Sequence, residues 1–237
     1  MIAVTVVTPS YRHLEKEAVK RIKKFTGLPV RVIRCADKDG FMKKLELDRE
    51  CGRQRVLFVD VDIWIQKPVN FETWDSSCFF AVHDAGVYNP EIFPCQDCEL
   101  YQMNKMMYFN SGLMLMDFRI KSHREVFQKA RVFARQVETG KLPKPFDRTD
   151  QLFLNMAVQK VGVNFSLLPQ KFNYYHFGWE YGQVQVIPRD IIGLHAAGFP
   201  VKEKLQALQE QERVLCNVKR PMWPDAIRMK YANIFEM

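Results

Sequence analysis

The 237-residue sequence contains no long hydrophobic run. No stretch approaches the roughly 18 apolar residues of a transmembrane helix. The N-terminal segment MIAVTVVTPSY lacks the basic region and the cleavage site of a secretory signal. Internal repeats and low-complexity segments are also missing. We therefore expect a cytoplasmic protein without a membrane-spanning helix.

Cysteine is sparse, and its spacing is irregular. Six cysteines occur in the chain, and only Cys95 and Cys98 form a CxxC pair. One such pair is half of a zinc site, and no second pair at a suitable spacing completes it. In a chain without an export signal, these residues are expected to be reduced thiols rather than a disulfide framework.

Motifs for nucleic-acid binding are absent as well. The net charge of +8 attracts polyanions, which include nucleic acid, an acidic lipid surface and a phosphorylated small substrate. However, the chain has no zinc-finger spacing, no basic heptad and no RNP-type aromatic motif, so nucleic acid is not an expected partner. The chain does have 47% hydrophobic residues, enough for one domain with a well-buried core.

Strand and helix signals alternate in the first half of the chain. Runs of β-branched and apolar residues predict strands at 3–8, 30–33 and 56–59, and helical spacing predicts helices at 14–25 and 41–50. This alternation predicts an α/β domain with a mostly parallel central sheet covered by helices. In such a sheet, ligands bind at the carboxyl ends of the strands.

The second half continues the pattern less regularly. Ser122, with Glu125 three residues later, predicts a capping box at the start of a helix that runs to about residue 137. Residues 83–107 show little periodicity and are expected to form a functional loop. The other predicted elements are strands at 79–82, 108–118, 165–168 and 184–187, and helices at 150–160 and 203–215.

An acidic pair follows the most apolar predicted strand. Asp60 and Asp62 come directly after residues 56–59, and two positions apart in an extended chain their side chains share a face. Two converging carboxylates suit a hard cation such as Mg²⁺ or Mn²⁺. Taken alone, the pair also fits a solvated turn at a strand end.

Several other segments accompany the pair and together carry a resemblance. They are DVDIW at 60–64, FNSG at 109–112, DQxxLN at 150–155 and HxxG at 195–198. With them the sequence resembles the retaining GT-A glycosyltransferases, particularly glycosyltransferase family 8. The resemblance implies the GT-A nucleotide-diphospho-sugar transferase fold, a single Rossmann-like domain. It implies a catalytic domain at 1–202, followed by a C-terminal helix and a basic, aromatic tail at 203–237.

The resemblance also implies a divalent metal, Mn²⁺ or Mg²⁺. Its implied ligands are Asp60, Asp62 and His195. Without the other motifs, His195 would fit an ordinary core histidine, because it follows an apolar segment.

Further residues are implied to bind the donor. Lys44 matches a lysine that approaches the donor, and Asn110 is expected to contact the donor sugar. Lys202 is the candidate for a lysine that meets the diphosphate, although it comes one residue later than the HxxGxxK spacing. Ser111 and Gly198 belong to the same donor-binding motifs.

Two polar residues at the start of the helix predicted at 150–160 are the remaining catalytic candidates. The resemblance implies that Asp150 and Gln151 line the donor-sugar and acceptor side, close to the anomeric carbon. Whether either acts as a nucleophile stays open. Asp84 follows the strand predicted at 79–82 and is a weaker candidate.

A separate group of residues follows the first two predicted strands, where GT-A enzymes receive the nucleobase. Thr8 and Tyr11 follow the first strand, and Asp37 follows the second. We expect these residues to contact the base or the ribose, since a tyrosine ring can stack on a base.

The implied reaction transfers a hexose from a nucleotide diphosphate sugar, such as a UDP-sugar, to a hydroxyl of a glycan, a lipid-linked acceptor or a protein. Two other interpretations remain. A haloacid-dehalogenase-type phosphohydrolase also places DxD after a strand, but it favours Thr or Val where this chain has Trp64. A binding module without catalysis would use the basic surface and the basic, aromatic tail at 217–237 for peripheral contact with a membrane or another polyanion. The same tail could also rest on an anionic membrane while the domain glycosylates a lipid-linked acceptor.

Overall fold

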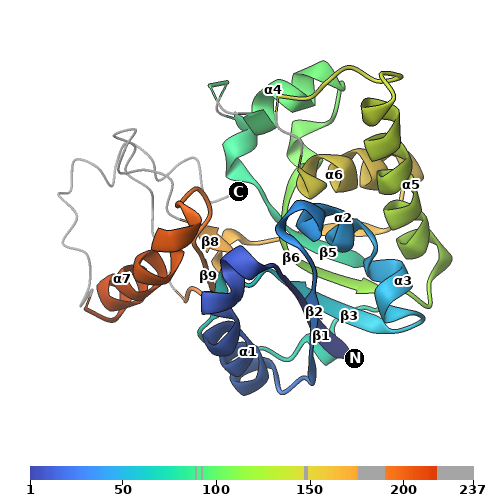
Figure 1. Ribbon diagram of the computed structural model, residues 1–237. Helices are drawn as coiled ribbons and strands as arrows, with labels where there is room; N and C mark the ends of the chain where they lie inside the picture. Colours follow the sequence, from blue (N-terminus) through green and yellow to red (C-terminus); the bar gives the residue numbers. More distant parts are fainter. Residues whose placement is uncertain (89, 92, 147–148, 176–189, 218–237) are drawn as a thin grey trace, which may run out of the picture.

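A six-stranded sheet forms the centre of the computed structural model (Figure 1). The structure describes residues 1–88, 90–91, 93–146, 149–175 and 190–217, so the strand predicted at 184–187 and the tail beyond 217 lie outside it. Among the described residues, no helix is both long enough and apolar enough to cross a bilayer. The strands of the sheet are β1 (Ile2–Val7), β2 (Val30–Arg34), β3 (Arg55–Val59), β5 (Phe79–His83), β6 (Phe109–Asp117) and β7 (Phe165–Leu168).

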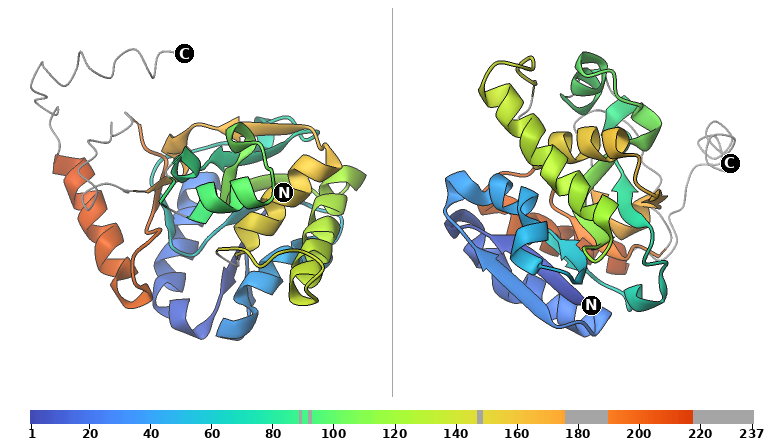
Figure 2. Two further views of the ribbon diagram at one scale, coloured as in Figure 1. Left: turned by 90° about the horizontal axis from the view of Figure 1, so that it is seen from above. Right: turned by 90° about the vertical axis from the view of Figure 1, so that its right-hand side faces the viewer.

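The sheet is mostly parallel, as the sequence predicts. Its order is β2-β1-β3-β6-β5-β7, and β6 alone among these strands runs antiparallel to its two neighbours. The α-helices are α1 (Arg12–Thr26), α2 (Gly40–Leu45), α3 (Leu47–Cys51), α4 (Phe93–Leu100), α5 (Lys121–Glu138), α6 (Asp150–Val161) and α7 (Lys204–Asn217). Figures 1 and 2 show α2, α3, α5 and α6 on one side of the sheet, away from α1 and α7.

A smaller sheet of three short strands brings distant segments together. Its strands, in the order β4-β9-β8, are β4 (Ile63–Ile65), β9 (Gly193–His195) and β8 (Tyr174–Tyr175). The sequence did not predict them, because strands of two or three residues are too short to show periodicity. In the antiparallel pairing of β4 with β9, Ile63 lies opposite His195.

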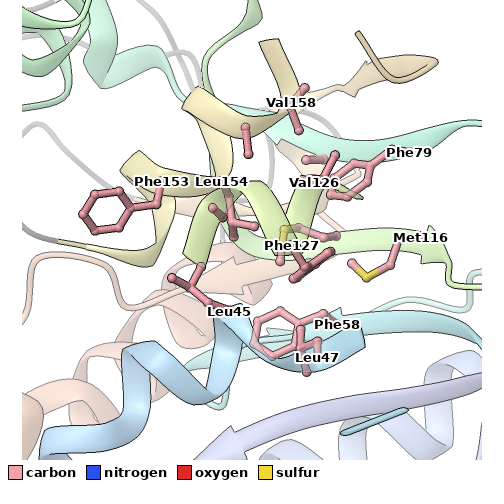
Figure 3. Close-up of a cluster of buried hydrophobic side chains, with 14 of the residues drawn as sticks. Leu45, Leu47, Phe58, Phe79, Met116, Val126, Phe127, Phe153, Leu154 and Val158 are labelled. Carbon is pink, nitrogen blue, oxygen red and sulfur yellow. The ribbon is translucent and has the colours of Figure 1, made fainter. Parts of the chain in front are cut away.

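The two faces of the main sheet bury alternate residues of the same strands. Val56 and Phe58 of β3 belong to the buried cluster that includes residues of α5 and α6, and Phe58 is labelled in Figure 3. Leu57 and Val59 pack on the opposite face. Burial on both faces explains why this strand reads as a continuous apolar run rather than an alternating one.

A buried ion pair joins Asp48 of α3 to Arg131 of α5. Arg131 of α5 donates from Nη1 and Nη2 to the two carboxylate oxygens of Asp48, at 2.6 and 2.9 Å. The same Nη1 also donates to the carbonyl oxygen of Leu45, at the end of α2. Both side chains are almost fully buried, at 7% and 5% exposed. The pair therefore ties the two short helices to α5.

Three local predictions were wrong in detail. The helix predicted at 41–50 is two helices that meet at Glu46. Residues 83–107 contain the helix α4, whose buried Pro94, Cys95 and Cys98 give no clear apolar face. The capping box of Ser122 does not form, because α5 begins at Lys121, one residue before Ser122, and its N-cap is Ile120 without a side-chain cap.

A histidine organises the start of α5 in place of that capping box. The Nδ1 atom of His123 accepts a hydrogen bond from the backbone N–H of Asp117 at 2.9 Å, and the ring is fully buried. The Asp117 carboxylate in turn accepts from the backbone N–H of Arg119. These bonds fix the chain between β6 and α5.

We expect His123 to make the protein less stable in mild acid. Burial lowers the pKa of His123 below its ordinary value of 6.5, so protonation favours the unfolded chain. The free energy of unfolding should therefore fall as the pH drops below about 6.5, by at most about 1.4 kcal/mol per pH unit for one proton. Urea unfolding between pH 5 and 8 measures this. His123→Gln, which keeps an acceptor without titrating, should flatten the dependence, and His13→Gln on the exposed start of α1 should not. Parallel curves for wild type and His123→Gln would contradict the assignment.

Candidate active site

Two carboxylates and an imidazole converge at the carboxyl end of β3. One ligand atom from each of Asp60, Asp62 and His195 can be chosen so that all three lie within 4.8 Å of one another. The backbone N–H of Asp60 donates to the carbonyl oxygen of Gly112 at 2.7 Å, which fixes the end of β3 against β6. His195 reaches the pair because β9 is aligned with β4. The structure thus brings together the three residues that the sequence proposed as metal ligands.

The Asp62 carboxylate is buried between the His195 imidazole and the Lys204 ammonium. Its Oδ1 atom lies 3.5 Å from Nε2 of His195, and its Oδ2 atom accepts from Nζ of Lys204 at 2.6 Å. Burial raises the pKa of Asp62, but His195 and Lys204 outweigh it and hold the pKa well below its ordinary value. The Asp62 carboxylate is therefore ionised.

Asp60 has a different environment, which is more open and contains a second lysine. Nζ of Lys44 donates to both of its oxygens, at 3.1 and 3.0 Å. Burial raises the pKa of Asp60 to about 6, with Lys44 acting against the shift and Asp62 and Asp150 adding to it. Because a metal ligand must be deprotonated, a cation would bind best above that value.

Lys44 joins the acidic pair to the start of α6. The residue is 5% exposed, and its ammonium also lies 2.9 Å from Oδ2 of Asp150 and donates to the hydroxyl of Ser111 at 3.1 Å. The Ser111 hydroxyl donates to Asp150 Oδ2 at 2.7 Å. Burial lowers the pKa of Lys44, but Asp150 and Asp60 outweigh it and raise the pKa above its ordinary value, so this lysine stays charged.

The polar chain continues through Gln151. Its Oε1 atom accepts from the backbone N–H of Ser111 at 3.2 Å, and its Nε2 atom donates to Asp84 at 2.8 Å. Asp84 is buried and also accepts from the backbone N–H of Gly86. Gln151 is thus held at both ends, and the weak candidate Asp84 is one of its partners.

The Asn110 side chain accepts two hydrogen bonds, one of which connects β6 to a neighbouring segment of the site. Its Oδ1 atom accepts from the N–H of Gly112 at 2.9 Å and from Nδ2 of Asn173 at 2.7 Å. Asn173 is fully buried and was not among the sequence candidates. Only its amide side chain in a segment rich in aromatics could have suggested it.

Gly112 is required where the two halves of the site meet. A Cβ atom at this position would lie 2.8 Å from Ile63 Cδ1, 2.9 Å from Asn110 Oδ1 and 3.1 Å from Cε1 of His195. Gly112, the last residue of FNSG, therefore allows β6 to approach His195.

We expect Gly112→Ala to lower the free energy of unfolding by about 1–3 kcal/mol, because the methyl group overpacks a filled site. It should also move the His195 ring. Chemical denaturation measures the first effect, and the NMR chemical shift of the His195 Hε1 proton measures the second. Wild-type stability together with an unshifted His195 resonance would refute the close-approach argument.

The residues expected to bind the base form a group beside the acidic pair. The Asp37 carboxylate accepts from the backbone N–H of Ser10 at 3.1 Å and from the Thr8 side chain. The Tyr11 ring lies 5.7 Å from Nζ of Lys204. Burial, with a contribution from Asp62 and Asp60, raises the pKa of Tyr11 to about 12, so the phenol is neutral.

The segment after His195 differs from the HxxGxxK motif in the lysine that reaches the site. Gly198 has a φ of +80°, a conformation that suits glycine. Lys202 is exposed in the short 3₁₀ helix Val201–Glu203, whereas Lys204, two residues later, enters the site. No spacing rule in the sequence pointed to Lys204.

The three converging residues fit a divalent cation. Their donors are two carboxylates and one imidazole, a set that suits Mn²⁺, Mg²⁺ or Zn²⁺. The 3.5 Å between Asp62 Oδ1 and His195 Nε2 is a separation that two ligands of one ion can have. Three protein ligands also leave coordination positions for a substrate.

The order of the central sheet and the position of this site define the fold as GT-A, that of the nucleotide-diphospho-sugar transferases. Among solved structures, the chain is similar to the galactosyltransferase LgtC in complex with donor and acceptor sugar analogues. The two share 15% sequence identity, with a TM-score of 0.59, over 89% of this chain and 96% of that chain. An active-site mutant of LgtC gives the same values. No protein-family model and no curated protein matches the sequence.

Proposed function

We propose that this protein is a metal-dependent retaining glycosyltransferase that moves a hexose from a nucleotide diphosphate sugar, such as a UDP-sugar, to an acceptor hydroxyl. The observation that carries the proposal is the convergence of Asp60, Asp62 and His195 with the Lys44–Asp150 pair at one edge of a GT-A sheet. The similarity in fold to LgtC, which was solved with donor and acceptor sugar analogues, supports a sugar-transfer role.

Asp60, Asp62 and His195 would hold Mn²⁺ or Mg²⁺. When bound, such an ion supplies positive charge for the diphosphate leaving group. Lys44 adds a second, buried positive charge next to Asp60. Lys202 remains a candidate for the diphosphate if the exposed side chain turns inward, and Thr8, Tyr11 and Asp37 form the candidate base and ribose site.

Asp150 and Gln151 are proposed to face the transferred sugar, together with Asn110. Gln151 is fixed by Ser111 and Asp84, so its amide is presented in one orientation. An amide is a poor nucleophile, and Asp150 is engaged by Lys44 and Ser111. We therefore favour front-face attack, in which the leaving phosphate oxygen takes the acceptor proton. The proposed acceptor is a hydroxyl of a glycan, a lipid-linked acceptor or a protein.

The decisive experiment is a panel of UDP-, GDP- and CDP-sugars with Mn²⁺. A UDP-sugar is expected to raise the melting temperature only when Mn²⁺ is present and to be hydrolysed slowly without an acceptor. The anomer of the product then tests retention. If no nucleotide sugar changes the melting temperature or is consumed, the proposal fails.

The phosphohydrolase interpretation is tested with the same preparation. In the structure, both oxygens of Asp60 accept from Lys44, which leaves this carboxylate poorly suited to attack a phosphorus atom. Hydrolysis of p-nitrophenyl phosphate without any sugar nucleotide would favour the phosphatase over the transferase.

A further inference from the structure

Lys204 is a buried cation whose role no sequence motif assigned. It begins α7 and is 6% exposed, although lysine is rarely buried without a partner. Its Nζ atom donates to Asp62 Oδ2 and to the carbonyl oxygen of Ala196, both at 2.6 Å. The lysine therefore bridges the segment after β3 and the segment after β9.

The choice of carboxylate oxygen is informative. Lys204 binds Oδ2 of Asp62, while Oδ1 faces Nε2 of His195 at 3.5 Å. The ammonium therefore does not occupy the oxygen that faces the imidazole. Rotation of the carboxylate would break the contact with Lys204.

The backbone repeats this connection. The N–H of Ala196 donates to the carbonyl oxygen of Asp62 at 3.1 Å. Asp62 is thus joined to the residue after His195 both through its main chain and, by way of Lys204, through its side chain. The segments that contain Asp62 and His195 are distant in sequence, and these hydrogen bonds hold them together.

We propose that Lys204 is a positioning residue of the metal centre: it fixes the Asp62 carboxylate so that Oδ1 and His195 Nε2 are presented together to a divalent cation. The inference rests on the proposed function, because it takes Asp62 and His195 as metal ligands. Outer residues that orient a ligating carboxylate commonly contribute a factor of about 10–100 to metal affinity. The opposite effect, repulsion between the ammonium and the cation, would make Lys204 a competitor of the metal.

The test is the affinity of the full chain for Mn²⁺ alone, measured from the EPR signal of the free ion without any nucleotide. Lys204→Met removes the ammonium while keeping much of the side-chain volume, and we expect it to weaken Mn²⁺ binding by about 10–100-fold. Lys204→Arg keeps the charge and should recover most of the affinity. The matched control is Lys20→Met on α1, where the lysine side chain is 69% exposed and the affinity should not change.

If Lys204→Met does not fold, Lys204→Gln provides the same comparison, with at least a tenfold loss expected. Equal or tighter Mn²⁺ binding by folded Lys204→Met or Lys204→Gln would overturn the inference and identify the lysine as a bystander or a competitor. Absence of Mn²⁺ binding by the wild-type protein would overturn both this inference and the metal dependence of the proposed function. If Mn²⁺ binds as expected but no nucleotide sugar is turned over, only the proposed function fails.

Discussion

Asp62→Asn is expected to reduce metal-dependent hydrolysis of the nucleotide sugar by at least about 1,000-fold, or about 4 kcal/mol at the transition state. Asparagine has nearly the same shape but carries no charge. It would leave Lys204 and His195 without the ionised carboxylate that joins them. The measurement is the initial rate of nucleotide release with saturating Mn²⁺, combined with the Mn²⁺ affinity of the same variant.

A suitable control for this substitution is Asp75→Asn. Asp75 is exposed, and its Oδ1 atom accepts from the backbone N–H of Ser77 in a turn that asparagine can also form. Its rate should match that of the wild type. Should Asp62→Asn keep more than a tenth of the wild-type rate, Asp62 would not be part of the metal centre.

Arg131→Met is expected to lower the free energy of unfolding by about 3–5 kcal/mol. The substitution leaves the Asp48 carboxylate buried at 5% exposure with no cation beside it, and it removes the donor to Leu45. Urea unfolding followed by circular dichroism gives the value. Since α2 also carries Lys44, the variant should reduce turnover as well as stability.

The neighbouring Arg135→Met on the exposed side of α5 is the matched control and should change the free energy of unfolding by less than about 0.5 kcal/mol. The double variant Asp48→Leu/Arg131→Met should recover part of the loss, because a buried ion pair can often be replaced by apolar side chains. An Arg131→Met protein as stable as Arg135→Met would show that the pair contributes nothing.

The main sheet was predictable from the sequence because each of its strands has a local signal in its own residues. The run from Val56 to Val59 is apolar on both faces, and β7 was located to the residue. Helix α6 ends at Val161, and Gly162 after it has the left-handed conformation expected of a glycine that caps a helix. Each of these signals lies within a few neighbouring residues.

What could not be predicted depends on pairing between distant segments. The motif resemblance named His195 as a partner of the acidic pair, but the pairing of β4 with β9 that brings it there was not predicted, because each of these strands has three residues and no readable period. Lys204 enters the site because α7 starts beside the turn after β9, and a lysine at a helix start usually lies in solvent. Such contacts are properties of the tertiary structure, so no local pattern could reveal them.

The reversed direction of β6 has a consequence for the order of events during folding. Since β6 runs against β3, its first residues, not its last, lie beside Asp60, and Val59 is paired with Leu113 more than fifty residues later in the chain. When a nascent chain has been synthesised only as far as Asp62, it contains β1 to β3 and both aspartates, but it still lacks β6, the strand that pairs with β3 at the site. If the proposed cation binds at Asp60 and Asp62, it can therefore stabilise only the completed sheet and not the early one. Mn²⁺ should then slow unfolding far more than it speeds folding.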